Sequence, residues 1–267
     1  MKSFVVYCLC FVAVFAHAPF ESVDHRIANG QVALPKQFPY QARLQFTKRK
    51  NGKFVSSLCG GALISNKTIL TAAHCVENAV SVMIFLGTTK SLSNEPTRVM
   101  RGSWASRGEF IAHKNFNGTS MENDIALVTT TQAIQFNDAI RPVNLPKFNQ
   151  MNLENRMAVI AGFGKTGTKA PVSNELRFAN RRILSNLLCQ RPYPAYFKPN
   201  MHLCIDGSQN ISTCPGDSGG PLVIQEADES KTVVGLTSFG GISCDTGYPV
   251  VFTKVSNYIN WIQKHMI

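Results

Sequence analysis

A chain of 267 residues is long enough to bury a substantial core, as one large domain or as two small ones. With 44% hydrophobic and 16% charged residues, its composition excludes an intrinsically disordered protein. The 27 lysines and arginines outnumber the 16 acidic residues and give a formal charge of +11, which predicts a strongly basic surface.

The first residues are typical of a secretory signal peptide. Met1-Lys2-Ser3 gives a positive start, an apolar stretch runs from Phe4 to Phe15, and Ala16-His17-Ala18 is a small-x-small cleavage site. A membrane anchor is the alternative, but the stretch is shorter than the ~20 residues of a membrane span. We therefore expect residues 1–18 to be removed and the mature protein to be secreted into the extracellular space, without a membrane anchor.

Most of the remaining chain carries short β-like runs separated by turn residues, which predicts an all-β fold. The runs are Gln41–Phe46, Gly61–Ile64, Val82–Phe85, Ile125–Thr129, Met157–Ala161, Pro221–Ile224, Val233–Thr237 and Val250–Lys254. Only the tail, Val255 to Ile267, predicts a helix, because its apolar residues recur at helical spacing.

Three segments carry the side chains that nucleophilic catalysis by serine requires. A tight glycine loop presents a serine beside its own backbone N–H groups in Gly216-Asp217-Ser218-Gly219-Gly220. A serine hydroxyl is a poor nucleophile, so it needs a histidine base and a carboxylate that orients the base. The base is present in Thr71-Ala72-Ala73-His74-Cys75, and a carboxylate with apolar neighbours in Asn123-Asp124-Ile125-Ala126-Leu127. Each segment alone could be an ordinary turn; together they predict a catalytic site.

With these motifs in the order His, Asp, Ser, the chain from about Ile27 to the C-terminus resembles the chymotrypsin-like (trypsin-fold) serine proteases. The resemblance implies two antiparallel six-stranded β-barrels with the active site between them and a C-terminal α-helix. It implies that His74 and Asp124 come from the first barrel and Ser218 from the second. The oxyanion hole would consist of the N–H groups of Gly216 and Ser218.

The resemblance also implies an inactive zymogen. Cleavage after Arg26 would remove a propeptide, residues 19–26, and free the α-amino group of Ile27. The new ammonium would pair with Asp217 and fix the loop that carries the oxyanion hole. The protease domain would then be residues 27–267, and its charge stays at +11 because residues 1–26 hold two basic and two acidic residues.

Cysteine usage indicates disulfides. Of eight cysteines, Cys8 and Cys10 lie in the signal peptide, and the remaining six could pair in 15 ways. The resemblance implies the pairs Cys59–Cys75, Cys189–Cys204 and Cys214–Cys244. A zinc site is the alternative, but no Cys-x-x-Cys or His-x-x-x-His spacing supports it. The acidic ladder of the family's calcium loop is missing between Leu86 and Arg101. We expect no metal and no cofactor.

The residues that match the family's specificity pocket indicate an apolar substrate side chain. Ser212 corresponds to the pocket floor, where an aspartate would select Arg and Lys. Gly240 leaves one wall open, whereas Val250 falls where the large-pocket enzymes have glycine. The segment Ser238-Phe239-Gly240 matches the strand that pairs with the substrate backbone, with Phe239 in place of the usual tryptophan. We expect cleavage after medium or large apolar residues, Leu and Met first, with Phe and Tyr left open.

The surface carries two further signals. Asn66 and Asn117 begin N-glycosylation sequons in expected surface turns, whereas a glycan on Asn210 would crowd the pocket. Basic residues crowd an expected loop after the first strand (Lys48, Arg49, Lys50 and Lys53) and a later segment (Arg98, Arg101 and Arg107) that lies beside that loop in the resembling family. They form either a merely solvated surface or a site for an acidic protein or a heparin-like glycan.

Two functions remain open on these grounds. The first is a monomeric, secreted endopeptidase with protein substrates and inhibitors such as serpins as partners, either digestive or directed at host or plasma proteins. The second is a catalytically dispensable binding protein on the same fold, acting through its basic surface. The intact triad of His74, Asp124 and Ser218 favours the first.

Overall fold

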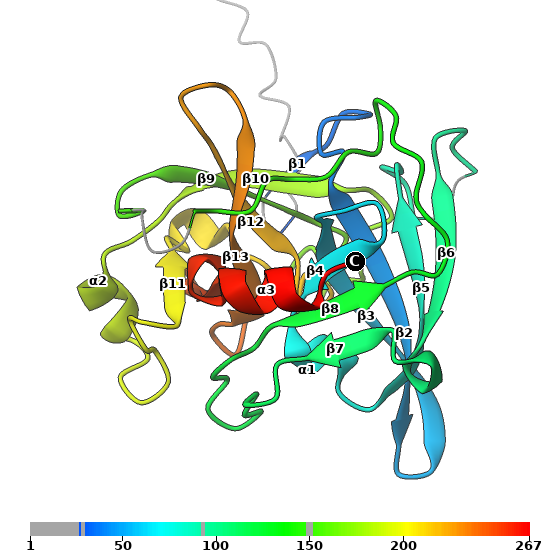
Figure 1. The fold of residues 1–267 in the computed structure, drawn as a ribbon. Coiled ribbons are helices and arrows are strands. Elements are labelled where there is room, and N and C mark those ends of the chain that lie inside the picture. Colours follow the sequence, from blue (N-terminus) through cyan, green and yellow to red (C-terminus); the bar gives the residue numbers. More distant parts are fainter. Residues whose placement is uncertain (1–26, 28–29, 92–93, 148–151) are drawn as a thin grey trace, which may run out of the picture.

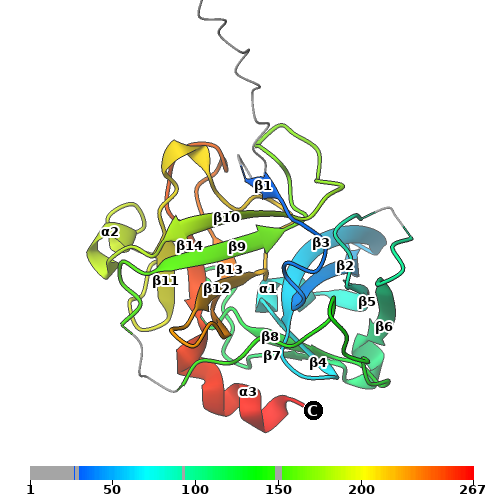
Figure 2. The same cartoon turned by 90° about the horizontal axis from the view of Figure 1, so that it is seen from above.

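The computed structural model describes residues 27, 30–91, 94–147 and 152–267, and it confirms an all-β fold. The expected signal peptide, the propeptide and Arg26 lie outside the described residues. The two halves of the chain each form one curled antiparallel sheet, and the two sheets lie side by side (Figures 1 and 2). In the described part of the chain, no helix has the length and hydrophobicity to cross a membrane.

The first half forms a sheet with the strand order β6-β5-β2-β3-β4-β8-β7. Its strands are β2 (Gln41–Lys50), β3 (Lys53–Leu63), β4 (Thr68–Thr71), β5 (Ala79–Leu86), β6 (Val99–Trp104), β7 (Phe110–Ala112) and β8 (Ala126–Thr129), with the short helices α1 (Ala73–Val76) and η1 (Ala105–Arg107). Alternate residues of β2, such as Leu44 and Phe46, are fully buried, because successive side chains of a strand point to opposite faces.

The second sheet has the order β1-β10-β9-β12-β13-β14-β11, and all its strands except β1 come from the second half of the chain. Its strands are β1 (Gln31–Val32), β9 (Met157–Gly162), β10 (Arg177–Arg182), β11 (His202–Ile205), β12 (Pro221–Gln225), β13 (Lys231–Phe239) and β14 (Val250–Lys254), with α2 (Asn186–Gln190) and η2 (Ser208–Asn210). Over the described residues each sheet therefore has seven strands, not the expected six. The two-residue β1 and the three-residue β7 extend the edges of the sheets.

The expected C-terminal helix begins as a 3-10 turn, η3 (Val255–Tyr258), and continues as α3 (Ile259–His265). Ile259 and Ile262 are buried in one cluster with Leu127 of the first sheet and Leu236 of the second. The helix therefore packs across both halves, as Figure 1 shows.

The sequence suggested a loop at Lys48–Lys53, but these residues form a β-hairpin. Lys48 to Lys50 continue β2 and Lys53 begins β3, so that Lys50 pairs with Lys53 across a tight hairpin. The turn is Asn51-Gly52, with φ of 49° and 76°. Positive φ at both central residues is what a two-residue hairpin turn needs, and Asn-Gly is its preferred sequence. The charged residues on both sides of Asn51-Gly52 lack the apolar alternation of a strand, so the hairpin was not expected from the sequence.

His202 of β11 connects the second sheet to the segment that precedes β8. Its Nδ1 accepts a hydrogen bond from the backbone N–H of Lys198, so the neutral ring carries its proton on Nε2, which lies 3.3 Å from the carbonyl oxygen of Met121. Burial lowers the pKa of His202, although Asp124 and Glu122 partly oppose this effect.

This arrangement predicts a loss of stability in acid. Because the folded-state pKa lies below the unfolded value of about 6.5, the unfolded chain binds the proton first as the pH falls. The stabilisation is complete above about pH 7 and is lost as the pH drops below 6.5. We expect the free energy of unfolding, measured in urea, to fall less between pH 8 and pH 5 in His202→Phe than in the wild type. Equal decreases in both proteins would contradict this role.

Candidate active site

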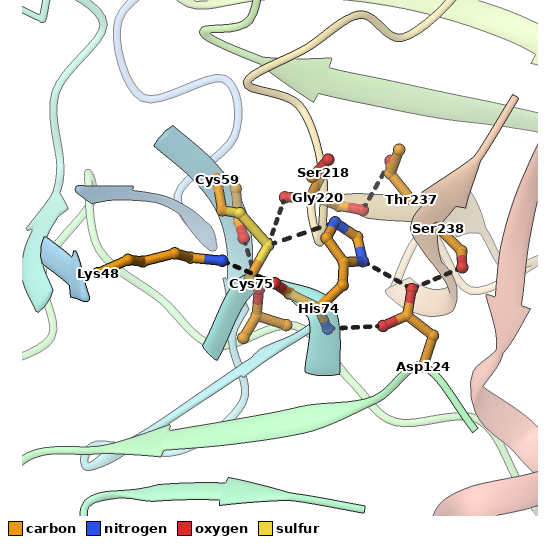
Figure 3. Close-up of a disulfide and its surroundings, with 11 residues drawn as sticks. Lys48, Cys59, His74, Cys75, Asp124, Ser218, Gly220, Thr237 and Ser238 are labelled. Atoms are coloured by element: carbon orange, nitrogen blue, oxygen red, sulfur yellow. Dashed lines mark hydrogen bonds and ion pairs between the residues drawn. A yellow bond between two sulfur atoms is a disulfide. The ribbon is translucent and has the colours of Figure 1, made fainter. Parts of the chain in front are cut away.

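The three residues of the expected triad lie together where the two sheets meet (Figure 3). His74 lies on α1, directly after β4 of the first sheet, and Asp124 lies two residues before β8. Ser218 lies in the loop that leads into β12 of the second sheet. The site is therefore assembled from segments that are 50 residues or more apart in the sequence.

Asp124 is fully buried and holds His74 at two points. Its Oδ2 lies 2.8 Å from Nδ1 of the imidazole, and its Oδ1 accepts the backbone N–H of His74 at 3.0 Å. Burial opposes ionisation of Asp124, but the charge of His74 and the hydrogen bonds from His74 and Ser238 outweigh it and keep the pKa below its usual range. An ionised Asp124 fixes the imidazole tautomer that leaves Nε2 free to accept a proton.

The second half of the chain also holds Asp124. Ser238 donates its hydroxyl to Oδ2 at 2.6 Å, and Thr253 donates its hydroxyl to the Asp124 carbonyl oxygen at 2.7 Å. Tyr258 lies 3.3 Å from the side-chain oxygen of the neighbouring Asn123. The sequence analysis missed Thr253 and Tyr258. A fully buried threonine within the apolar strand Val250–Lys254 was the available signal.

The loop around Ser218 depends on two glycines. Gly216 has φ of 105°, and a side chain there would lie 2.8 Å from the Cα of Gly164. Gly219 has φ of 71°, and a side chain there would collide with Thr71. Such backbone conformations and close approaches favour glycine. The loop can therefore press closely against β4 and the segment after β9.

Hydrogen bonds from both sheets fix this loop. The carbonyl oxygen of Ser218 accepts the N–H of Gly60 in β3 at 2.8 Å, and the N–H of Gly219 donates to Thr237 in β13 at 2.8 Å. Within the described chain, the N–H groups of Gly216 and Ser218 donate to no other residue. Two unused N–H groups beside a serine can donate hydrogen bonds to a ligand oxygen, as the expected oxyanion hole requires.

The hydroxyl of Ser218 makes no hydrogen bond to His74 among the described residues. His74 Nε2 lies 3.8 Å from the sulfur of Cys75. Catalytic hydrogen bonds are often long without substrate and tighten when it binds. The structure thus brings the two groups into one site but does not join them.

A cavity of about 250 Å³ opens beside Ser218. All the residues expected in the pocket line it, namely Ser212, Ser238, Phe239, Gly240 and Val250, and none of its lining side chains is charged. Val250 Cγ2 lies 3.9 Å from the point where a Cβ on Gly240 would stand, so these two residues face each other across the cavity. Uncharged walls of this kind suit an apolar side chain.

Asp217 is buried, and its carboxylate accepts the N–H of Gly164 at 2.7 Å and that of Cys214 at 3.0 Å. Burial raises the pKa of Asp217 to about 6, against the effect of these two hydrogen bonds. No cationic side chain among the described residues forms an ion pair with it. Gly162 and Gly164, which the sequence analysis missed, leave the space for its carboxylate. Glycines within a strand pattern were the available signal.

The structure contains the three disulfides that the resemblance implies, Cys59–Cys75, Cys189–Cys204 and Cys214–Cys244. The first joins β3 to the helix of His74, and the third lies at the wall of the cavity. Cys59, His74 and Cys75 come within 4.8 Å of one another, but both sulfurs are oxidised, so no thiolate is left to bind a metal.

Lys48 does not belong to a free basic surface, contrary to the sequence interpretation. It is partly buried, and its ammonium donates to the carbonyl oxygen of His74 at 2.8 Å (Figure 3). Its neighbours Arg49 and Lys50 are exposed. Lys48 therefore contacts the site, whereas Arg49 and Lys50 of the same strand face the solvent.

Comparison with known proteins agrees with this geometry. A family model described as Trypsin matches residues 27–262. A collagenase from Hypoderma lineatum is 34% identical over 272 residues, which cover 99% of this chain and 98% of the relative. A chymotrypsin from Phaedon cochleariae is also 34% identical and covers 90% of this chain and 82% of its own length.

Solved structures show the same fold. HL collagenase superposes with a TM-score of 0.76 at 35% identity, covering 88% of this chain and 96% of that one. The structure of GrC gives a TM-score of 0.78 at 28% identity, over 89% of this chain and 98% of that one. Together with the family match over nearly the whole chain, these likenesses show that the chain belongs to the trypsin family of chymotrypsin-like serine endopeptidases.

Proposed function

We propose that this serine endopeptidase is secreted as a zymogen and cleaves proteins after medium or large apolar residues through a covalent acyl-enzyme. One observation carries the proposal. The buried pair of Asp124 and His74 lies beside a serine loop with two unused N–H groups, at the mouth of an uncharged cavity.

In this mechanism Ser218 Oγ attacks the carbonyl carbon of the scissile peptide while His74 Nε2 takes the hydroxyl proton. The C–N bond then breaks, and His74 delivers the proton to the leaving amine. Water, activated by the same histidine, hydrolyses the ester and restores Ser218. Asp124 stays ionised throughout, consistent with its lowered pKa, and stabilises the imidazolium that forms in each half of the cycle.

The N–H groups of Gly216 and Ser218 would bind the oxyanion of the tetrahedral intermediate. Removal of one such donor in related chemistry costs roughly 3–4 kcal/mol of transition-state stabilisation. The bonds of Ser218 and Gly219 to the two sheets support the loop that carries both groups. Pairing of Asp217 with the freed Ile27 ammonium would then fix this loop for catalysis.

Activation by cleavage after Arg26 is supported by the state of Asp217. Burial disfavours the ionised form of this carboxylate by about 3 kcal/mol relative to an aspartate in water, given a pKa of about 6 instead of 3.8. A buried charge is tolerated when an opposite charge is supplied. The side chain of Ile27 is buried in the same cluster as Ile160, two residues before Gly162, whose Cα faces Asp217. A freed Ile27 ammonium would thus supply the missing cation.

The function is tested by Ser218→Ala, which we expect to abolish peptide hydrolysis while the protein stays folded. The side chain is small, and backbone groups make the oxyanion hole. Loss of a triad nucleophile lowers kcat by about a million-fold. The protein is first treated with trypsin, and N-terminal sequencing confirms cleavage before Ile27. Turnover of peptide substrates and labelling by a fluorophosphonate are then measured.

The matched control for activation is Arg26→Gln, which keeps Ser218 but removes the expected cleavage site. It should be neither cut at Ile27 nor labelled. Ordinary turnover by Ser218→Ala would refute the triad. A folded and correctly cleaved wild-type protein with neither turnover nor labelling would favour the binding-protein function. An active form with another N-terminus would refute the activation mechanism alone.

The specificity is tested by Val250→Gly. Removing the β-branched wall opposite Gly240 should deepen the cavity and raise kcat/KM for Phe and Tyr relative to Leu. Changes of a few methylenes in an apolar pocket alter discrimination by about 1–3 kcal/mol. Val250→Ala should shift the same ratio by less. A ratio that is the same in all three proteins would remove Val250 from the wall.

The surface partners are proposed as acidic proteins or heparin-like glycans, together with inhibitors such as serpins at the active site. Arg49 and Lys50 are exposed at the hairpin tip. Arg98 instead lies over the Phe85 ring with Arg43, near the other end of β2, so the basic residues do not form one cluster. Asn66 and Asn117 are exposed, as glycan acceptors must be.

The glycan proposal is tested by the double reversal Arg49→Glu and Lys50→Glu, which leaves Lys48 in place. Retention on a heparin column should decrease more than in a control with the same charge change at exposed positions elsewhere, Arg182→Glu and Lys264→Glu. Equal retention of both variants would mean that only the net charge matters.

A further inference from the structure

The contact between Lys48 and His74 joins residues 26 positions apart. Lys48 lies in β2, in the row of side chains that begins with the buried Leu44 and Phe46. A register shift against β5 occurs between Thr47 and Lys48. A bulge of this kind changes the direction in which a side chain points. Figure 3 shows the ammonium reaching the carbonyl of His74.

The carbonyl of His74 needs a partner because α1 is too short to supply one. The helix has only four residues, and Glu77 leaves it with φ of −58° and ψ of 127°. The N–H of Glu77 donates to the carbonyl oxygen of Ala73, but within the described chain no backbone N–H donates to the carbonyl oxygen of His74. Helix ends leave such carbonyls unpaired, and a lysine there is favourable because the oxygens carry partial negative charge.

The hydrogen bond to the carbonyl of His74 stabilises the partly buried ammonium of Lys48. Burial lowers the pKa of its ammonium, and the nearby Glu77 carboxylate offsets part of the effect. Among the described residues no carboxylate lies within ion-pair distance of it. A partly buried cation costs free energy unless it is hydrogen-bonded. The carbonyl of His74 is its hydrogen-bond acceptor.

We propose that Lys48 is a positioning residue for His74. Asp124 holds the N–H of His74 and its imidazole, and Lys48 holds the carbonyl on the other side of the same Cα. Two opposite charges thus fix the backbone of the general base from both ends. The disulfide of Cys75 to Cys59 anchors the next residue. Nε2 is kept in line with the serine loop without any contact between Lys48 and the substrate.

The test compares Lys48→Met with Lys264→Met, the same substitution at an exposed position on α3. Both are trypsin-activated, and the folded active fraction is counted by fluorophosphonate titration. We expect kcat per active site to fall about ten- to a hundredfold in Lys48→Met with KM nearly unchanged, since small misplacements of a catalytic group have this effect. Lys264→Met should keep the wild-type kcat.

Lys48→Arg should recover most of kcat, because a guanidinium can also donate to the carbonyl. The low-field ¹H NMR resonance of the proton between His74 and Asp124 should shift or broaden in Lys48→Met and return in Lys48→Arg. If Lys48→Met does not fold, Lys48→Leu, which also lacks a donor, takes its place with the same expected signs. A wild-type kcat in the folded variant, or an arginine variant no better than methionine, would overturn the proposal.

This inference rests on the proposed role of His74, and His74→Ala separates the two. If His74→Ala is inactive while Lys48→Met keeps its kcat, only the role of Lys48 fails. If His74→Ala keeps full activity, the proposed active site fails and the role of Lys48 fails with it.

Discussion

The burial of one carboxylate, Asp124, at the boundary between the two sheets is the constraint on which the site depends. An ionised group without access to water is stable only if each oxygen has a partner. The partners of the two carboxylate oxygens come from both halves: the helix of His74 on one side and Ser238 on the other. Thr253, also from the second half, holds the backbone carbonyl of Asp124. The interface that hides the charge is therefore also the one that orients the histidine.

Asp217 shows the same physics with a different outcome. It is as deeply buried as Asp124, yet its described partners are only the two N–H groups of Gly164 and Cys214. Its pKa is accordingly raised, whereas that of Asp124 is lowered. Two aspartates of nearly equal burial thus differ because the side chains of His74 and Ser238 stabilise the ionised Asp124, whereas Asp217 has only two backbone N–H groups among the described residues. A carboxylate stabilised in this way suits a permanent site, and one held by N–H groups alone suits the later arrival of a cation, as the proposed activation requires.

Sequence reasoning succeeded where the signal was local. The motifs around His74, Asp124 and Ser218 are contiguous, and the eight expected strands each overlap a strand of the structure, because apolar runs between turns are short-range patterns. The expected runs did not include β1, β4, β6, β7, β10 and β11. In β6 and β10, arginine and other polar residues interrupt the alternation, and the other four strands have only two to four residues. The polar run of the β2–β3 hairpin likewise concealed its Asn-Gly turn.

Contacts between distant segments were beyond the reach of such patterns. Thr253 meets the Asp124 carbonyl across 129 residues, and Gly164 meets Asp217 across 53. No spacing of residues within a short segment predicts contacts of this kind. Lys48 is an intermediate case. Its place in the row of Leu44 and Phe46 indicated an inward side chain, but its basic neighbours suggested solvent.

The hydrogen bond from Gly60 to the carbonyl of Ser218 crosses from the first sheet to the second. A chain in which only one half has folded lacks this bond, and its serine loop has nothing to press against. The serine loop can therefore take this conformation only in a molecule whose two halves are both folded and in contact. Loss of either half, by incomplete folding or by damage, removes a support of the nucleophile even when the sequence around Ser218 is intact.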